Sequence, residues 1–340
     1  MRRVLVISEG SPGHDAQTRG LVDELSARYP ELEVATLCIM QRLGGLLRII
    51  GRQLMGRSGH NLPKSIQQLF VKLDAAAVKS LVAPDVVISS GGQSVFAALH
   101  MARRFGAPYI YIGERKPYPS EWFHTVFTPS PLEQGVNDFA IDLIPTGVTP
   151  KKVEAAAYTY DRPEGKLWAM VIGGESRSHK YSEQDWVELA HGMNALALEY
   201  DIRWLLTTSR RTGARAEALL KEHIDPEYLA DSVWWSEAPR KIMLAFFGAA
   251  ERVFVTQDSV TMVSECVASG KVVTVVAPGY VLLKCTSFVS GYLQRLDSSD
   301  IVSRLKIDGF SSQSYQTLPS LAPLIPVELR MVDHLLKRLR

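Results

Sequence analysis

The stretch that decides the fold is RRVLVISEGSPGHDAQTRGLVDELSARY, residues 2–29. Its apolar run, Val4 to Ile7, is far too short for the core of a signal peptide and is typical of a buried strand. A loop with glycine and proline follows, and from Ala16 to Tyr29 the apolar residues recur at helical spacing. Strand, tight loop and helix in this order are the repeating unit of a parallel sheet covered on both faces.

The same order of elements recurs along the chain. Further apolar runs end in polar loops at 86–89, 109–112, 125–128, 168–172, 204–207, 252–256 and 271–276. The pattern pauses between about 145 and 166, where proline, glycine and charged residues prevail. We therefore predict an α/β protein with two Rossmann-like, doubly wound domains facing a cleft, and ligands at the carboxyl ends of the strands.

Domain limits follow from the same signals, because 340 residues exceed what one hydrophobic core usually organises. We place an N-terminal, acceptor-side domain at 1–150, a linker at 151–166 and a C-terminal, nucleotide-sugar-binding domain at 167–320. The tail, 321–340, has apolar residues at helical spacing. It is expected to form an amphipathic helix that docks, with the first domain as its candidate surface.

Composition excludes several classes of protein. A net charge of +2 gives no general reason to expect nucleic acid as a partner. The cysteines, Cys38, Cys266 and Cys285, are scattered and lack metal-ligand spacing, so we expect neither a disulfide framework nor a metal site. No apolar window approaches the roughly 18 residues of a membrane-spanning helix. These features predict a cytoplasmic protein whose contact with the inner membrane would be peripheral.

The most specific candidate site is TQDSVTMVSE, residues 256–265. Asp258, Ser259 and Thr261 crowd the start of a helix that follows a strand. Unpaired backbone N–H groups and the positive end of a helix suit a diphosphate. Glu265, about one turn further on, is placed to accept the hydroxyls of a ribose. On spacing alone, a capped helix with Glu265 at the surface fits equally well, because Ser and Asp are also preferred caps.

Two other polar loops follow strands of the same domain. Gly173 and Gly174 would let the backbone approach a ligand, with polar and basic residues beside them from 176 to 180. Arg210 and Arg211 follow the next strand, and guanidinium groups match phosphate oxygens. Each loop alone is equally a plain turn or a solvated loop. Because parallel strands share one carboxyl edge, their convergence favours an anionic ligand such as a nucleotide phosphate.

The predicted donor-binding residues are those that these loops contribute. They are Gly173, Gly174, Ser176, Arg177, Ser209, Arg210, Arg211, Asp258, Ser259, Thr261, Ser264 and Glu265.

In the first domain, the loop expected at 8–15 carries an imidazole and carboxylates. If it faces the donor, His14 can act as a general base on an acceptor hydroxyl, with Asp15 or Glu9 orienting the ring. The alternative is an ordinary solvated histidine. Acceptor-side contacts are expected from the glycine loops. They are Gly13, Gly91, Gly92 and Gln93.

A third feature lies between Glu33 and Asp74, where there is no acidic residue and basic residues alternate with Leu, Ile and Met. This pattern is typical of a segment that lies at a membrane surface. An ordinary helix with its apolar face in the core and its arginines in water explains it as well. The first interpretation makes a lipid-linked acceptor plausible.

Several of these pieces resemble the mitochondrial fission ELM family of bacteria and plants. They are SPGHDAQTRGL at 11–21, PDVVISSGGQSVFAAL at 84–99, VIGGES at 171–176, TTSRRTG at 207–213 and FVTQDSVTMVSECVASGK at 254–271. The resemblance spans most of the chain and implies a glycosyltransferase-B-like (GT-B-like) fold. The chain departs from the family at Val272, where a proline is usual, and over 114–131, so the acceptor stays open.

The same positions also look like those of the peptidoglycan GlcNAc transferase and the nucleotide-sugar 2-epimerases. In those folds a glycine-rich loop with a histidine faces the acceptor, and a helix with Ser and Glu holds diphosphate and ribose. The resemblance therefore implies these roles for His14, Ser259 and Glu265.

Together these features predict an inverting, metal-independent glycosyltransferase without a cofactor. It would move a sugar from a nucleotide-diphosphate donor to a cell-envelope or lipid-linked acceptor, with the departing diphosphate stabilised by preorganised positive potential. Two alternatives stay open: a non-catalytic protein that binds a partner at membranes, and a nucleotide-sugar 2-epimerase.

Overall fold

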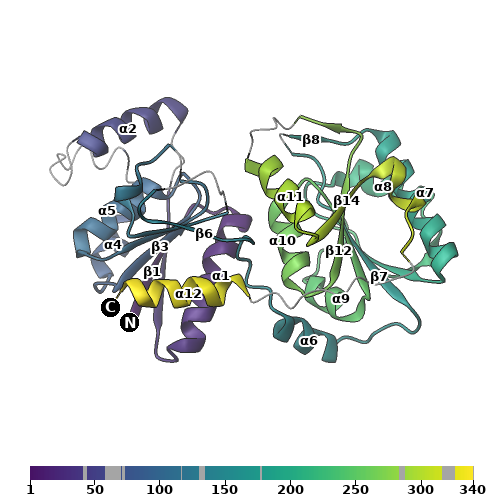
Figure 1. Cartoon of the computed structure of the whole chain (residues 1–340), viewed down its shortest axis with the longest axis horizontal. Helices are drawn as coiled ribbons and strands as arrows, with labels where there is room; N and C mark the ends of the chain where they lie inside the picture. The colour runs from purple at the N-terminus through teal and green to yellow at the C-terminus, as the bar shows by residue number, and fades with distance from the viewer. Residues whose placement is uncertain are drawn as a thin grey trace. The chain divides into compact units, whose positions relative to one another are not determined.

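The computed structural model describes residues 1–40, 44–57, 70, 73–115, 117–129, 135–176, 178–282, 288–315 and 326–339. The chain forms two compact units (Figure 1). Unit 1 is Met1–Gly147 with Ile325–Arg340, and unit 2 is Val148–Leu324. Each unit is built on a six-stranded sheet whose described strand pairs are all parallel. The predicted pair of doubly wound α/β sheets is confirmed.

In unit 1 the sheet has the strand order β2-β1-β3-β4-β5-β6. The strands are β1 (Arg3–Ser8), β2 (Glu33–Cys38), β3 (Val86–Ser90), β4 (Tyr109–Ile112), β5 (Thr125–Thr128) and β6 (Asp138–Ala140). The helices are α1 (Pro12–Arg28), α2 (Gly45–Arg57), α4 (Ala75–Ser80), α5 (Val95–Phe105) and α12 (Val327–Arg338), with a short 3-10 helix at Ser120–Trp122.

The first strand shows why its apolar run is continuous. Val4 and Val6 pack with α1 and α12, whereas Leu5 and Ile7 pack with α5 on the other face of the sheet. Side chains alternate along a strand, so a strand buried on both faces needs apolar residues at every position.

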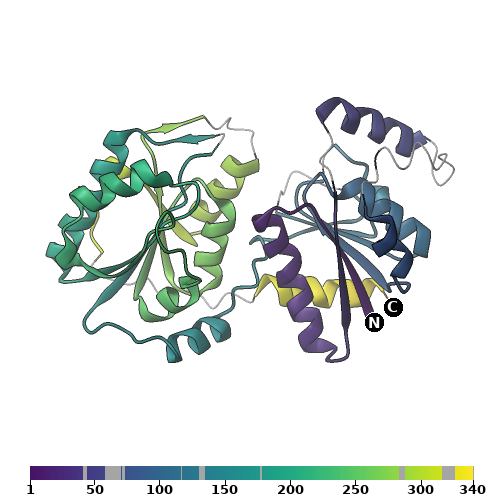
Figure 2. The ribbon, with the colours of Figure 1, turned by 180° about the vertical axis from the view of Figure 1, so that it is seen from behind.

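Helix α12 brings the end of the chain back to unit 1. Its Met331, Val332 and Leu335 are fully buried in the same cluster as the first strand. Arg28 of α1 pairs with Asp333 at 2.8 Å. In Figures 1 and 2 the yellow α12 accordingly lies beside the purple N-terminal elements.

In unit 2 the sheet has the strand order β10-β9-β7-β11-β12-β14. The strands are β7 (Leu167–Val171), β9 (Arg203–Thr207), β10 (Leu229–Val233), β11 (Arg252–Thr256), β12 (Val272–Ala277) and β14 (Val302–Lys306), and β8 (His179–Lys180) pairs antiparallel with β13 (Tyr280–Val281). The helices are α6 (Pro150–Tyr158), α7 (Glu183–Tyr200), α8 (Gly213–His223), α9 (Met243–Ala249), α10 (Val260–Ala268) and α11 (Phe288–Ser298), with 3-10 turns at Pro226–Tyr228 and Ile307–Ser312.

The first half of the segment interpreted as a linker, 151–166, is helical in the structure. Pro150 starts α6, and the Thr149 hydroxyl caps it by accepting from the Lys152 N–H at 3.3 Å. Gly248 of α9 lets α6 come close, because a Cβ there would lie 2.4 Å from the Cβ of Ala157. Pro150 takes the first position of this helix, and the exposed Lys151, Lys152 and Glu154 lie on its solvent side, whereas 159–166 form neither helix nor strand.

Candidate functional site

The structure places His14 in the first turn of α1 rather than in a loop, because the helix already begins at Pro12. Its Nδ1 lies 2.7 Å from Oε1 of Glu9. A carboxylate only accepts hydrogen bonds, so the imidazole donates from Nδ1 and keeps a lone pair on Nε2. The Glu9 side chain is only 6% exposed, whereas that of His14 is 38% exposed. Glu9 thus fixes the ring, and His14 presents a basic nitrogen to solvent.

The loop between β3 and α5 completes this pair. The backbone N–H of Gln93 donates to the other oxygen of Glu9 at 2.9 Å. Gly91 has a φ of +86°, and a Cβ there would lie 2.4 Å from Oε2 of Glu9 and from Nδ1 of His14. Only glycine fits both the backbone conformation and the space. We refer to His14 and Glu9 as the dyad.

Of the two carboxylates predicted to orient His14, Glu9 does so. Asp15 instead accepts from the Ser8 hydroxyl at 2.5 Å, and Ser8 in turn accepts from the Gly10 N–H at 2.9 Å. Asp15 therefore shapes the turn that leads into α1. Gly13 lies in the first turn of the same helix.

Gly92 is held by two residues that the sequence did not single out for the site. Its carbonyl oxygen accepts from the Tyr118 hydroxyl at 3.0 Å, and Arg48 donates to that hydroxyl at 3.2 Å. A Cβ on Gly92 would lie 2.5 Å from Nη2 of Arg48. Tyr118 lies in the stretch that departs from the family pattern, and no local signal connects it to Gly92.

In unit 2, Asp258 is the buried centre of the carboxyl edge. Its side chain has no exposed surface, and its Oδ2 lies 2.6 Å from Nη2 of Arg211. Its Oδ1 accepts from Tyr181 at 3.1 Å and from Thr256 at 2.7 Å. Neighbouring side chains thus occupy both carboxylate oxygens of Asp258. We therefore assign Asp258 the role of positioning Arg211.

The two glycines after β7 serve contacts within the protein. A Cβ on Gly173 would lie 2.2 Å from Oδ2 of Asp258. Gly174 has a φ of +115°, and a Cβ there would lie 2.4 Å from the carbonyl oxygen of Arg211. The Ser209 hydroxyl donates to the Gly173 carbonyl oxygen. The loops after β7 and β9 are thus joined to each other and to Asp258.

The basic residues expected near these loops differ in their charge and in their contacts. Arg210 is exposed and has no hydrogen-bond or ion-pair partner in the part of the chain that the structure describes. Lys180 pairs with Glu175 at 2.9 Å. Burial lowers the pKa of His179, so this residue is neutral near pH 7 and supplies no positive charge. Arg177 lies outside the described residues.

His179 belongs to a chain of hydrogen bonds that sequence reasoning missed. Arg304 of β14 donates to Oε1 of Gln257 at 2.8 Å, and Nε2 of Gln257 lies 3.0 Å from Nε2 of His179. On the other side of the ring, Nδ1 lies 3.0 Å from the Ser178 hydroxyl and 3.3 Å from that of Ser176. Ser176 therefore stabilises its own turn.

Helix α10 carries the remaining predicted donor residues. Ser259 caps it, its hydroxyl accepting from the Met262 N–H at 3.4 Å. The buried hydroxyl of Ser264 lies 2.7 Å from that of Tyr292 and donates to the Val260 carbonyl oxygen at 2.6 Å, so it packs α10 against α11. Thr261 and Glu265, four residues apart, lie on one face of the helix, and both are partly buried.

Glu265 is unusual among the acidic residues of unit 2. It is half-buried, and within the described residues its carboxyl group has no hydrogen-bond partner. Burial raises its pKa to about 7 from an ordinary value of 4.5. A carboxyl group in this state gains from a ligand that brings hydroxyl donors.

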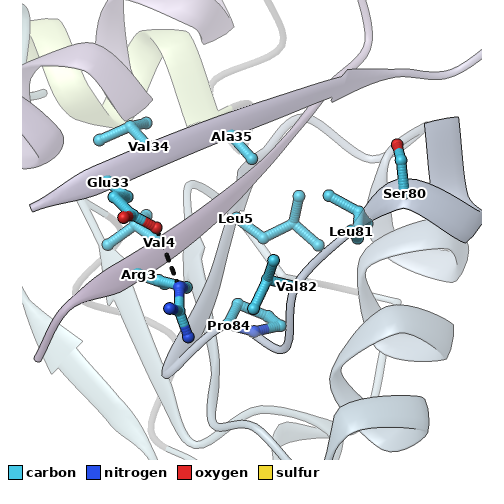
Figure 3. Close-up of a pocket in the computed structure, with 10 residues that line it drawn as sticks. All are labelled: Arg3, Val4, Leu5, Glu33, Val34, Ala35, Ser80, Leu81, Val82 and Pro84. Carbon is cyan, nitrogen blue, oxygen red and sulfur yellow. Dashed lines mark hydrogen bonds and ion pairs between the residues drawn. The ribbon is translucent and has the colours of Figure 1, made fainter.

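Two pockets of unit 1 lie away from these residues. Figure 3 shows one of about 220 Å³ at the start of β1 and β2, where the ion pair of Arg3 with Glu33 stands beside Leu5, Leu81 and Val82. A second, of about 380 Å³, is lined by Met1, Tyr29, Asp85, Pro108, Leu336 and Leu339. Both are at the amino ends of the strands, the edge opposite the dyad, and neither includes a predicted site residue.

Metal-binding clusters and membrane-spanning helices are both absent from the described residues. These residues contain no cluster of His, Cys, Asp and Glu able to hold a metal ion. None of their helices has the length and apolar character needed to cross a membrane.

Comparison with known proteins identifies the family. Residues 12–323 match the family described as Mitochondrial fission ELM1. The chain belongs to this family. The resemblance seen in the sequence motifs is thereby confirmed, and no curated protein matches this ELM1-family chain significantly.

Solved structures show what the ELM1-family fold is similar to. A Staphylococcus aureus MnaA–UDP complex is 12% identical to this chain. The alignment covers 98% of this chain and 96% of that one, with a TM-score of 0.50. A putative UDP-N-acetylglucosamine 2-epimerase from Listeria monocytogenes is 13% identical, covers 98% and 95%, and has a TM-score of 0.51. At such low identity the likeness shows the fold alone, which is GT-B-like.

Proposed function

We propose that this ELM1-family protein is a glycosyltransferase, in which unit 2 holds a nucleotide-diphosphate sugar and His14 of unit 1 deprotonates the acceptor. The observation that carries the proposal is the dyad. A buried carboxylate, itself held by a backbone N–H, fixes an exposed imidazole with Nε2 as its basic atom. This arrangement is what general-base catalysis on a hydroxyl requires.

The donor site is proposed at the carboxyl edge of the sheet of unit 2. The first backbone N–H groups of α10, other than that of Met262, which Ser259 caps, would bind the diphosphate together with the helix dipole. Arg210 is exposed on a neighbouring loop, and none of the described residues pairs with its guanidinium group. Glu265 would accept hydroxyls of the ribose, which supply the donors that its carboxyl group lacks within the described residues.

In the proposed reaction the acceptor oxygen attacks the anomeric carbon while the bond from that carbon to the diphosphate oxygen breaks. The hydroxyl proton goes to Nε2 of His14, and the electron pair leaves with the diphosphate. A single displacement inverts the anomeric centre. The start of α10 and Arg210, in place of a metal ion or cofactor, would stabilise the negative charge that develops.

A nucleotide-sugar 2-epimerase is the second candidate. The observation in its favour is that the dyad offers an acid–base group of the kind that epimerisation also uses, on a fold shared with an epimerase. Epimerisation needs no acceptor, so the products distinguish the two reactions.

The test is product analysis with labelled nucleotide sugars, with and without a lipid extract as the source of acceptors. Transfer predicts a labelled lipid-soluble product and free nucleoside diphosphate only when the extract is present. His14→Ala should lower the rate by a factor of 10²–10⁴, the usual contribution of a general base. His124→Ala is the matched control, since His124 directly precedes β5 at the amino ends of the strands, the edge opposite the dyad. A new sugar epimer without extract would support the second candidate, and no product with any donor would refute both.

A further inference from the structure

Helix α2 exposes apolar side chains to solvent, whereas an ordinary surface helix buries them against the core. Its apolar residues Leu46, Ile49 and Ile50 are 72%, 50% and 38% exposed. Their spacing puts them on one stripe, and Leu47 at its edge is also exposed. Figure 1 shows α2 beyond the carboxyl end of the sheet of unit 1, set apart from the other helices of that unit. We refer to these four residues as the α2 stripe.

The opposite face of α2 holds the helix to unit 1. A Cβ on Gly51 would lie 2.8 Å from the ring of Phe70, so glycine allows the helix to approach the core. Arg48 donates to Tyr118 at 3.2 Å, and Arg52 donates to the Pro117 carbonyl oxygen at 3.5 Å. The arginines therefore lie behind the stripe, and the helix cannot bury its apolar residues by rotating without breaking these contacts.

Charge indicates what the stripe meets. Between Glu33 and Asp74 the sequence has six basic residues and no acidic one, while the rest of the chain has 32 basic and 36 acidic residues. Positive charge is thus concentrated in the segment of sequence that contains the stripe, and the described Arg48 and Arg52 lie on the stripe's own helix. An apolar stripe with cations behind it is the geometry of a helix lying in a membrane interface, with the stripe among acyl chains and the cations level with the headgroups.

The docked helix would be coupled to the dyad. Arg48 and Tyr118 hold the carbonyl of Gly92, and the adjacent Gly91 packs directly on Glu9 and His14. Only a few contacts therefore separate the stripe from the basic nitrogen.

We infer that the α2 stripe is the docking surface of this protein for bilayers with anionic lipids. The inference of docking rests only on the exposed apolar stripe and on the excess of basic residues between Glu33 and Asp74. That it brings His14 to an acceptor anchored in the bilayer rests on the proposed function.

The experiment is co-sedimentation of the full chain with phosphatidylglycerol–phosphatidylcholine vesicles at low salt, without nucleotide sugar. Wild type should bind these vesicles, bind pure phosphatidylcholine vesicles more weakly, and be released as salt rises. Ile49→Gln with Ile50→Gln should weaken binding roughly tenfold or more, since each substitution removes a side chain's worth of buried apolar surface. Leu198→Gln, on a residue 74% exposed in unit 2, is the matched control and should bind as wild type does.

Several results would overturn the inference. One is a wild type that stays in the supernatant with anionic vesicles, and another is a double variant that binds as tightly as wild type. A wild type that dimerises through the stripe, becomes monomeric in the double variant and ignores vesicles would assign the stripe to a second copy. Leu46→Gln checks the result independently, and thermal unfolding verifies that each variant folds. Loss of vesicle binding with retained transfer to a soluble acceptor, or the reverse, separates this inference from the proposed function.

Discussion

Burial of the Glu265 carboxyl group makes the stability of unit 2 depend on pH in a direction opposite to that of most acidic residues. Burial raises its pKa from 4.5 to about 7. The folded state therefore holds a proton that the unfolded state has already released between these values. The free energy of unfolding should fall as pH rises through this window and level off above it.

The size of the effect follows from the shift. A change of one pKa unit corresponds to about 1.4 kcal/mol, so ionising Glu265 in the folded state costs about 3 kcal/mol above pH 7. Glu265→Gln keeps the shape of the side chain and removes the charge. The variant should be more stable than wild type by about 3 kcal/mol above pH 7 and nearly equal to it below pH 4.5.

The assay is urea unfolding at pH values on both sides of this window, followed by tryptophan fluorescence. Five of the six tryptophans lie in unit 2, so the signal mainly reports this unit. Glu199→Gln, on an exposed residue of α7, should show no such pH-dependent difference. The reasoning would be refuted if Glu265→Gln changed stability equally at both ends of the pH range, or if it destabilised the protein above pH 7.

Three further changes test the packing around the two candidate sites. Gly91→Ala should lower the free energy of unfolding by about 3 kcal/mol and disturb the dyad, because the new Cβ would overlap Glu9 at a positive φ. Gly10→Ala is the control, because Gly10 also has a positive φ but lies in open space. It should cost about 1 kcal/mol, and urea unfolding measures both variants. Asp258→Asn should cost about 2 kcal/mol in the same assay, because it leaves Arg211, which is one-third exposed, without its counter-charge. Ser264→Ala should cost about 1 kcal/mol and leave nucleotide binding unchanged in calorimetric titration, because its hydroxyl only joins helices.

Much of the fold could be predicted because its strands are buried on both faces. A run such as Val4 to Ile7 has no alternation, which indicates a central parallel strand without any knowledge of its neighbours. The segment at 151–166 shows the limit of this reasoning. Its composition is that of a loop, but a capping threonine and a glycine on α9 allow α6 to pack. That glycine is about a hundred residues away, beyond the reach of local patterns.

For the candidate sites, the sequence indicated which loops are involved, but it did not indicate what each residue does in them. Strand ends identified Asp258 and Arg211, but only the fold shows that they neutralise each other. Local spacing left Asp15 and Glu9 equivalent as partners of His14, and the structure selects Glu9. The amphipathic pattern of α2 could be recognised from sequence, whereas the outward direction of its apolar stripe depends on the contacts of Arg48 and Gly51.

The most direct test of a nucleotide-sugar site in unit 2 is the thermal stability of the protein against a panel of nucleoside diphosphates. At 100 times its dissociation constant, a ligand adds about 2.7 kcal/mol to stability. The account predicts that at least one of UDP, GDP, CDP and ADP raises the melting temperature of wild type, and that Glu265→Ala abolishes this rise while Glu199→Ala keeps it. No rise with any nucleotide, or an equal rise in Glu265→Ala, would contradict the account.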